Sequence, residues 1–341
     1  MIVLALIPFV DVAVSILPVF VFLASLVFLD SYKLVKFRSI VVTIILGCLA
    51  GIICYFLNNW AVAFLGVGTE IYRRYGSPVI EELVKALYLL YLLRSKKAGF
   101  MVDAAIYGFA IGAGFALIEN LYYVQQFPTA SVAVWIIRGF GTALMHGGTT
   151  AILGITSKSI SDRTSSESLQ VFLPGFLIAV IIHSFYNHFF FHPMTSTLLI
   201  LIILPLVMRI VFRQSEKGLR AWLHVGFDTD QELLRTMTSG NLSKTPVGAY
   251  LDSLQAKFSS DVVVDMLCYL RLHVELTIQA KGILLMRQAG FEVPPDASVR
   301  EKFTELRTLA RNIGQTGRLA ILPFLHTSGR ELWQLHMLNQ K

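Results

Sequence analysis

The first 213 residues are dominated by apolar stretches that are long enough to cross a lipid bilayer. They lie at about residues 2–29, 40–65, 79–93, 104–127, 132–156, 171–191 and 198–212. A bilayer requires roughly 20 mostly apolar residues per helix, and lipid offers no water to hydrogen-bond an exposed backbone. The sequence therefore predicts an all-α, polytopic membrane helix bundle of about seven transmembrane helices.

The last third of the chain differs in composition. Only 15% of all residues are charged, against about 25% in typical soluble domains, yet charges recur every few positions from 214 to 341. Ser298 and Glu301 form a capping signal ahead of apolar residues at helical spacing. We expect residues 1–213 to form a transmembrane core and residues 214–341 a soluble helical domain without a catalytic signature. That domain could lie on the membrane, bind a partner or self-associate.

Basic residues cluster in alternate loops of the transmembrane part. Lys and Arg are frequent at 33–38, 94–97 and 209–220, whereas most of the loops between them are weakly charged. Because cytoplasmic loops are enriched in Lys and Arg, the N-terminus is predicted outside and the C-terminal domain in the cytoplasm. We expect an integral protein of the cell (plasma) membrane. Its net charge of +7 sets orientation in the lipid bilayer and needs no nucleic acid.

Two neighbouring carboxylates and a lysine occupy the third apolar stretch. Glu81 and Lys85 are four residues apart and share a helix face, whereas Glu82 points about 100° away. One acid can therefore pair with Lys85 while the other faces something else. An ionisable residue inside a span costs at least a few kcal/mol, which makes it a candidate for function. The alternative is a helix-start signal, in which Pro78 begins the helix and the acids complement its dipole.

Further polar groups lie at a similar depth, in the predicted outer half of the membrane. Glu119 and Asn120 are on the fourth stretch, His146 is on the fifth, and His183 and Asn187 are one turn apart on the sixth. We expect Glu81, Glu82, Glu119, His146 and His183 to face one shared cavity. Arg138, eight residues before His146, either pairs with a carboxylate of this site or extends to the outer interface.

Carboxylates and histidines of this kind can activate water, either alone or through a metal ion. Two histidines with one or two glutamates from separate helices could hold zinc and leave one position open. The ligands would then come from Glu82, Glu119, His146 and His183. No cofactor is required by the sequence, which contains neither a His-Glu-x-x-His helix nor a Gly-x-Ser-x-Gly turn.

In order, these residues resemble the motifs of a known family. The motifs are Glu81-Glu82-x-x-Lys85, Phe115-x-x-x-Glu119-Asn120, Arg138 ahead of His146, and His183-x-x-Tyr186-Asn187. They resemble those of the PrsW family, intramembrane proteases of the superfamily that includes the CAAX prenyl proteases and bacteriocin-processing enzymes. The resemblance covers about residues 40–195.

The resemblance implies a membrane-embedded peptidase that acts on membrane-anchored proteins. In it, Glu81 or Glu82 would activate water with help from His146, and His183 and Asn187 would stabilise the oxyanion. The last motif of the family often ends in Asp, so Asn187 favours a hydrogen-bond donor over a metal ligand. Lys85, Asn120 and Arg138 would support the site structurally.

Two other functions are compatible with the sequence. A catalytically silent membrane scaffold would use the same acids only to hold helices together. A proton-coupled transporter would use the glutamate and histidine chain as a relay. Transporters of this kind usually contain internal repeats, and none is evident in the sequence, so the expected function is an intramembrane endopeptidase.

Overall fold

The computed structural model describes residues 9–164, 166, 168–238, 242, 245–291, 293, 296–325 and 338. Within these residues the regular structure is entirely helical, which confirms the predicted all-α fold. The chain divides into two compact units, Met1–Ser215 and Glu216–Lys341. Each unit is considered by itself.

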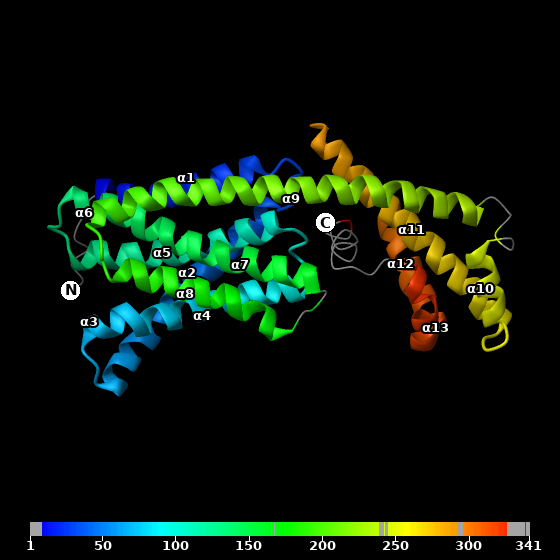
Figure 1. Ribbon diagram of the computed structural model, residues 1–341, viewed down its shortest axis with the longest axis horizontal. Coiled ribbons are helices and arrows are strands. Elements are labelled where there is room, and N and C mark those ends of the chain that lie inside the picture. The colour runs from blue at the N-terminus through cyan, green and yellow to red at the C-terminus, as the bar shows by residue number, and fades with distance from the viewer. Residues whose placement is uncertain are drawn as a thin grey trace. The chain divides into compact units, whose positions relative to one another are not determined.

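The first unit is a bundle of long helices (Figure 1). Its elements are α1 (Phe9–Leu29), α2 (Phe37–Leu65), α3 (Thr69–Ile71), the π-helical turn η1 (Tyr72–Gly76), α4 (Ser77–Arg94), α5 (Met101–Gln126), α6 (Val132–Ile137), the second π-helical turn η2 (Arg138–Ala143), α7 (Leu144–Thr164), the 3-10 turn η3 (Leu169–Phe172), α8 (Leu173–Asn187) and α9 (Pro193–Thr238). Part of the first predicted stretch, residues 2–8, lies outside the described residues.

Five helical segments are long and apolar enough to cross a membrane. They are α1, α2, α5, the segment Leu169–Asn187 that contains α8, and α9. Helices α4 and α7 do not belong to this set, because ionisable and polar residues interrupt their apolar surfaces. These five segments support an integral membrane protein. The total of seven transmembrane helices stays a prediction.

Two helices extend beyond the apolar stretches that the sequence predicts. The stretch 198–212 belongs to the 46-residue α9, which passes residue 213 without a break because the sequence there contains no helix-terminating signal except Gly218. The Ser/Thr-rich segment after residue 156 is helical as far as Thr164 at the end of α7. The charged and polar residues at these positions end the apolar stretches, but they do not end the helices α7 and α9.

Helix α5 forms the centre of the first unit. Its residues from Val102 to Ala116 are buried on every side, as expected for a helix that is apolar all round. It packs mainly against α7 and α2 and also against α1. Glycines make this contact close: a Cβ atom at Gly112 would lie 2.2 Å from the backbone oxygen of His146, and one at Gly47 would lie 2.2 Å from that of Ile111.

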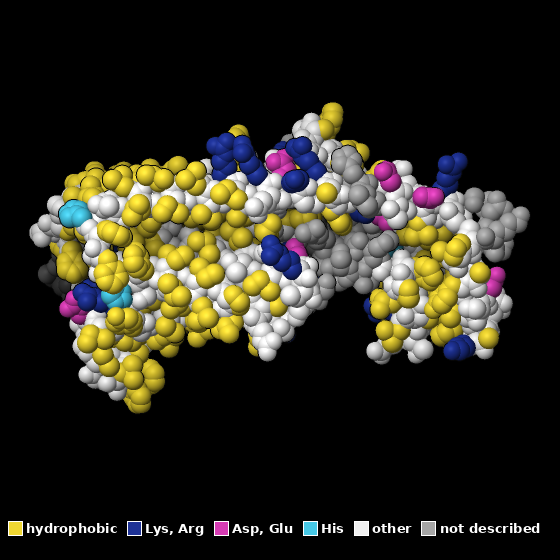
Figure 2. Space-filling view, in the orientation of Figure 1, with side chains coloured by type: hydrophobic (Ala, Val, Ile, Leu, Met, Phe, Trp, Pro, Cys, Tyr) yellow, Lys and Arg dark blue, Asp and Glu magenta, His cyan; other side chains and the backbone are white. Residues whose placement is uncertain are grey.

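The outside of the first unit is apolar, as expected for a surface in contact with lipid. Side chains such as Phe56, Ile202 and Leu206 are 66%, 59% and 55% exposed. Figure 2 shows hydrophobic side chains covering the visible faces of α8 and the first part of α9, with few charged groups among them.

The second unit has its own hydrophobic core. It contains α10 (Pro246–Leu254), α11 (Ser260–Gln288), α12 (Ala297–Asn312), α13 (Gly314–Ile321) and the 3-10 turn η5 (Leu322–Phe324), with the end of α9. Helix α11 packs against α10, α12 and α13. The cap of α12 differs from the prediction: Asp296 is the N-cap and accepts a hydrogen bond from the Ser298 backbone nitrogen at 2.9 Å, so the helix begins before Ser298.

Candidate active site

Glu82 of α4 is held by three donors at one oxygen. It is fully buried, and its Oε1 accepts hydrogen bonds from Lys85 Nζ at 2.6 Å and from Thr149 Oγ1 at 3.1 Å. The Nδ1 atom of His183 lies 2.8 Å from the same oxygen. Lys85 therefore pairs with Glu82 and not with Glu81, although Glu81 and Lys85 share a helix face. On a helix, a lysine can reach an acid that is three or four residues away. Here Thr149 on α7 and His183 on α8 hold Glu82 at the position where it contacts Lys85.

Glu81 faces a different set of partners. Its Oε1 accepts hydrogen bonds from Ser77 Oγ and, at 3.0 Å, from Asn58 Nδ2 of α2. The hydroxyl of Tyr72 in turn donates to Asn58 Oδ1 at 2.8 Å. The second oxygen of Glu81, Oε2, lies 3.7 Å from His183 Nε2. Glu81 thus presents one oxygen to the α2 side and the other to the histidine.

A chain of polar contacts positions His146 from the opposite side. Its Nε2 lies 2.8 Å from Glu119 Oε2, and Arg138 Nη2 lies 3.3 Å from the same oxygen. Arg138 Nε donates to Asn120 Oδ1 at 2.9 Å, and Asn120 Nδ2 donates to the backbone oxygen of Ser15 at 2.6 Å. Two positions were predicted for Arg138, and in the structure it lies beside a carboxylate of the site, that of Glu119. The chain ties α1, α5 and η2 to the histidine.

Each imidazole has one nitrogen within 2.8 Å of a carboxylate oxygen, while the second nitrogen lies 3.4 Å from Lys85 Nζ in His146 and 3.7 Å from Glu81 Oε2 in His183. Because an ionised carboxylate only accepts hydrogen bonds, we assign the ring protons to His146 Nε2 and His183 Nδ1. This leaves His146 Nδ1 and His183 Nε2 as acceptors or ligands. The two rings are perpendicular, with an interplanar angle of 89° and centroids 4.8 Å apart.

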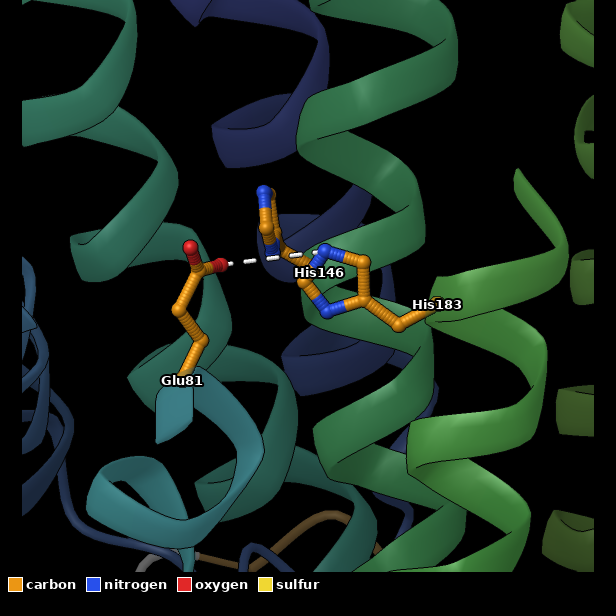
Figure 3. A group of neighbouring side chains, drawn as sticks. All are labelled: Glu81, His146 and His183. Carbon is orange, nitrogen blue, oxygen red and sulfur yellow. Dashed lines mark ion pairs between the residues drawn. The ribbon is translucent and has the colours of Figure 1, made fainter. Parts of the chain in front are cut away.

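Glu81, His146 and His183 point toward one another from α4, α7 and α8 (Figure 3). One ligand atom from each of the three lies within 4.8 Å of the other two. Two histidine nitrogens and one carboxylate oxygen form the ligand set of many catalytic zinc sites, which keep a further position open. In such sites, the ring nitrogen of each histidine that does not bind the metal also typically donates a hydrogen bond to a carboxylate. The residues present therefore fit zinc.

The charges around this group also suit a cation. Lys85 Nζ lies 3.4 Å from His146 Nδ1 and contributes one positive charge, and Arg138 contributes another. The carboxylates of Glu81, Glu82 and Glu119 outweigh these two charges. Of the predicted ligands, His146 and His183 belong to this group together with Glu81, whereas Glu82 and Glu119 lie 2.8 Å from a ring nitrogen of His183 and of His146.

Asn187 is engaged outside the glutamate and histidine group. Its Nδ2 donates to the backbone oxygen of Arg73 at 3.0 Å, and Ser184 Oγ donates to that of Arg74 at 2.6 Å. The two bonds fasten η1 to α8. Asn187 therefore holds the segment that leads into α4, and among the described residues it forms no hydrogen bond with the three clustered side chains.

A cavity of about 720 Å³ opens next to the site. Of the residues proposed from the sequence, its walls include Glu81, Glu119, His146, His183 and Asn187, with Arg138, whereas Glu82 is not among its lining residues. Aromatic side chains form much of the remaining wall; they are Tyr55, Phe56, Tyr72, Phe115, Tyr122, Tyr123, Tyr186 and Phe189. The site is thus a polar group at the wall of a largely apolar cavity.

Three partners of the site were missed by reasoning from the sequence. They are Tyr72, Ser77 and Thr149, which contact Asn58, Glu81 and Glu82. Ser77 lies four residues before Glu81 and Thr149 three residues after His146, so helical spacing from the charged residues could have found both. Tyr72 carries no comparable signal, because η1 departs from α-helical periodicity.

Comparison with known proteins gives a match to a family model. The model of the family described as PrsW family intramembrane metalloprotease matches residues 36–212, more than half of the chain. No curated protein and no solved structure matches the chain. The matched segment contains every residue of the glutamate and histidine group. The chain belongs to the PrsW family of intramembrane metalloproteases.

Proposed function

We propose that this chain is an intramembrane endopeptidase that cleaves a membrane-anchored protein, with zinc held by Glu81, His146 and His183. The observation that carries the proposal is the convergence of these three side chains, from three helices, at the wall of the cavity. Glu81 is preferred to Glu82 as the residue that faces the substrate. Glu82 is fully buried and has one oxygen taken by three donors.

Zinc bound there would polarise the peptide carbonyl and favour ionisation of a water molecule. The protein's own task is then to accept the proton of the attacking water and return it to the leaving amine. Glu119 is the other carboxylate on the cavity wall. Its Oε2 is engaged by His146 and Arg138, so we assign proton transfer to Oε1.

The remaining polar residues position these groups. Glu82 holds His183 in the orientation that leaves Nε2 toward Glu81, and Lys85 supplies the counter-charge for the buried Glu82. Arg138 fixes Glu119. We assign Asn187 to fastening η1 against α8, in place of the oxyanion role that the family resemblance suggested.

The orientation of the protein follows the distribution of basic loops. We place the N-terminus outside the cell membrane, the site in its outer half and the second unit in the cytoplasm. An apolar cavity wall beside a lipid-facing surface suits a substrate that is itself anchored in the membrane. Partner binding or self-association through the second unit stays a prediction.

The test combines zinc content with cleavage of a membrane-anchored reporter. In Glu81→Gln the side chain keeps its size but loses the ligand charge, so zinc content of the purified protein should fall. Cleavage should fall by about 100-fold or more. Elemental analysis measures the first and release of a fluorescent fragment the second. In Glu82→Gln, zinc affinity should fall by about 10- to 100-fold, the usual effect of losing an outer carboxylate.

Glu70→Gln is a matched control, because Glu70 is an exposed glutamate whose carboxylate pairs only with Arg74 among the described residues. It should keep zinc and activity. Full cleavage by both Glu81→Gln and Glu119→Gln would end the assignment of catalysis to this group of residues, whereas a wild-type protein that cleaves no reporter would favour a scaffold. A wild-type protein that stays active after chelation and contains no zinc would contradict the metal-dependent form of the proposal.

A further inference from the structure

Two adjacent arginines of η1 differ in their partners. Arg74 pairs with Glu70 at 2.5 Å. Arg73 has an exposed side chain and lines the cavity, and no ion pair with it is found in the described part of the chain. A cavity wall therefore contains one arginine whose charge is not matched by a neighbouring carboxylate.

The backbone that carries Arg73 is firmly held. Its own carbonyl accepts the hydrogen bond from Asn187, and the next carbonyl accepts one from Ser184. The preceding residue, Tyr72, is buried and bonded to Asn58. The guanidinium is thus presented from an anchored segment between α2 and α4. An anchored position favours recognition, because less conformational freedom is lost when a ligand binds.

The carboxylates of the same cavity are already engaged. Glu119 contacts Arg138 and His146, and Glu81 accepts hydrogen bonds from Ser77 and Asn58. Tyr123 of α5 lines the cavity together with Arg73. Among largely aromatic walls, an unmatched cation attracts an anion more strongly than it would in water.

We propose that Arg73 forms a subsite for an acidic side chain of the substrate, close to the peptide bond that is cleaved. The inference rests on the proposed function, since it names what the same cavity selects. A guanidinium is suited to bidentate pairing with a carboxylate. The cavity volume of about 720 Å³ falls in the range that holds a drug-sized ligand, comparable to a few residues of an extended chain.

The test uses a set of matched reporter peptides in phosphatidylcholine vesicles. Each reporter has one apolar span and a fluorophore–quencher pair, and aspartate, asparagine or lysine is placed in turn at each position flanking the span. The wild-type protein should prefer aspartate to asparagine by about tenfold in kcat/KM at one or two positions. Arg73→Gln should reduce this ratio to about one, and Arg73→Glu should favour lysine.

Arg74→Gln is the control, since Arg74 carries the same charge one residue away but is paired with Glu70. It should keep the wild-type ratio. An unchanged ratio in Arg73→Gln, or a wild-type protein with no preference for aspartate at any position, would overturn the subsite.

A binding measurement separates this inference from the proposed function. Photoreactive versions of the aspartate and asparagine reporters are cross-linked to the Glu81→Gln protein, and the captured fractions are compared. A preference for aspartate that depends on Arg73 supports the subsite even when no reporter is cleaved by the wild type, an outcome that would contradict the peptidase alone. Equal capture of the two reporters would overturn the subsite.

Discussion

Replacing Gly112 with alanine should inactivate the protein without altering any polar group. Gly112 lies on α5 where this helix crosses α7. A Cβ atom there would lie 2.2 Å from the backbone oxygen of His146, 2.5 Å from its carbonyl carbon and 2.7 Å from the Cα atom of Gly147. All three are backbone atoms, so no side chain can rotate away. The two helices themselves must separate.

The size of the displacement follows from these distances. Ordinary van der Waals contact begins near 3.4 Å, so the closest pair must part by about 1.2 Å. His146 is carried by the displaced backbone, while its partner Glu119 is on α5 with Gly112. The 2.8 Å contact between them would be stretched by a similar amount. Misplacement of a catalytic group by about 1 Å can cost about 100-fold in rate.

Stability should change much less than activity. Overpacking costs typically about 1–3 kcal/mol, and alanine regains up to about 1 kcal/mol relative to glycine in a helix. Reporter cleavage and thermal unfolding in detergent measure the two effects. The control is Gly218→Ala in α9, where no atom of the described residues lies within 4 Å of the added Cβ. It should be active and slightly more stable. If Gly112→Ala kept half or more of the wild-type activity, the close contact between α5 and α7 would not position His146.

Two further predictions concern buried ion pairs. Lys85→Met removes the ammonium from Glu82 while both side chains have no solvent exposure, so the free energy of unfolding should fall by about 3–5 kcal/mol. A wild-type melting temperature in detergent would contradict a stabilising role for the Lys85 ammonium. In the second unit, Lys281 Nζ lies 2.7 Å from Asp230 Oδ2 and both are buried. Lys281→Met should destabilise by a similar amount, and the double variant with Asp230→Asn should recover most of it. Equal melting temperatures for the two variants would contradict a role for the buried charge of Asp230.

The sequence by itself predicted the helical class, the apolar stretches and the set of polar residues that meet at the site. This was possible because the lipid bilayer requires long apolar helices, in which an ionisable residue is rare and easily recognised in the sequence. The position of each polar residue along its apolar stretch then predicted a similar depth in the membrane for Glu81, Glu119, His146 and His183. The count of spans was less accessible, because α4 and α7 carry the site residues and lose the apolar character by which a span is recognised.

Which partner each site residue takes was decided only by tertiary structure. Helical spacing allows Lys85 to reach either Glu81 or Glu82, and the choice depends on Thr149 and His183, which arrive from α7 and α8. The orientation of each histidine ring is likewise set by a carboxylate on another helix. These contacts join residues far apart in the chain, so no local pattern encodes them. Close packing at glycines, such as Gly112 against the backbone of His146, brings the helices near enough for the contacts to form.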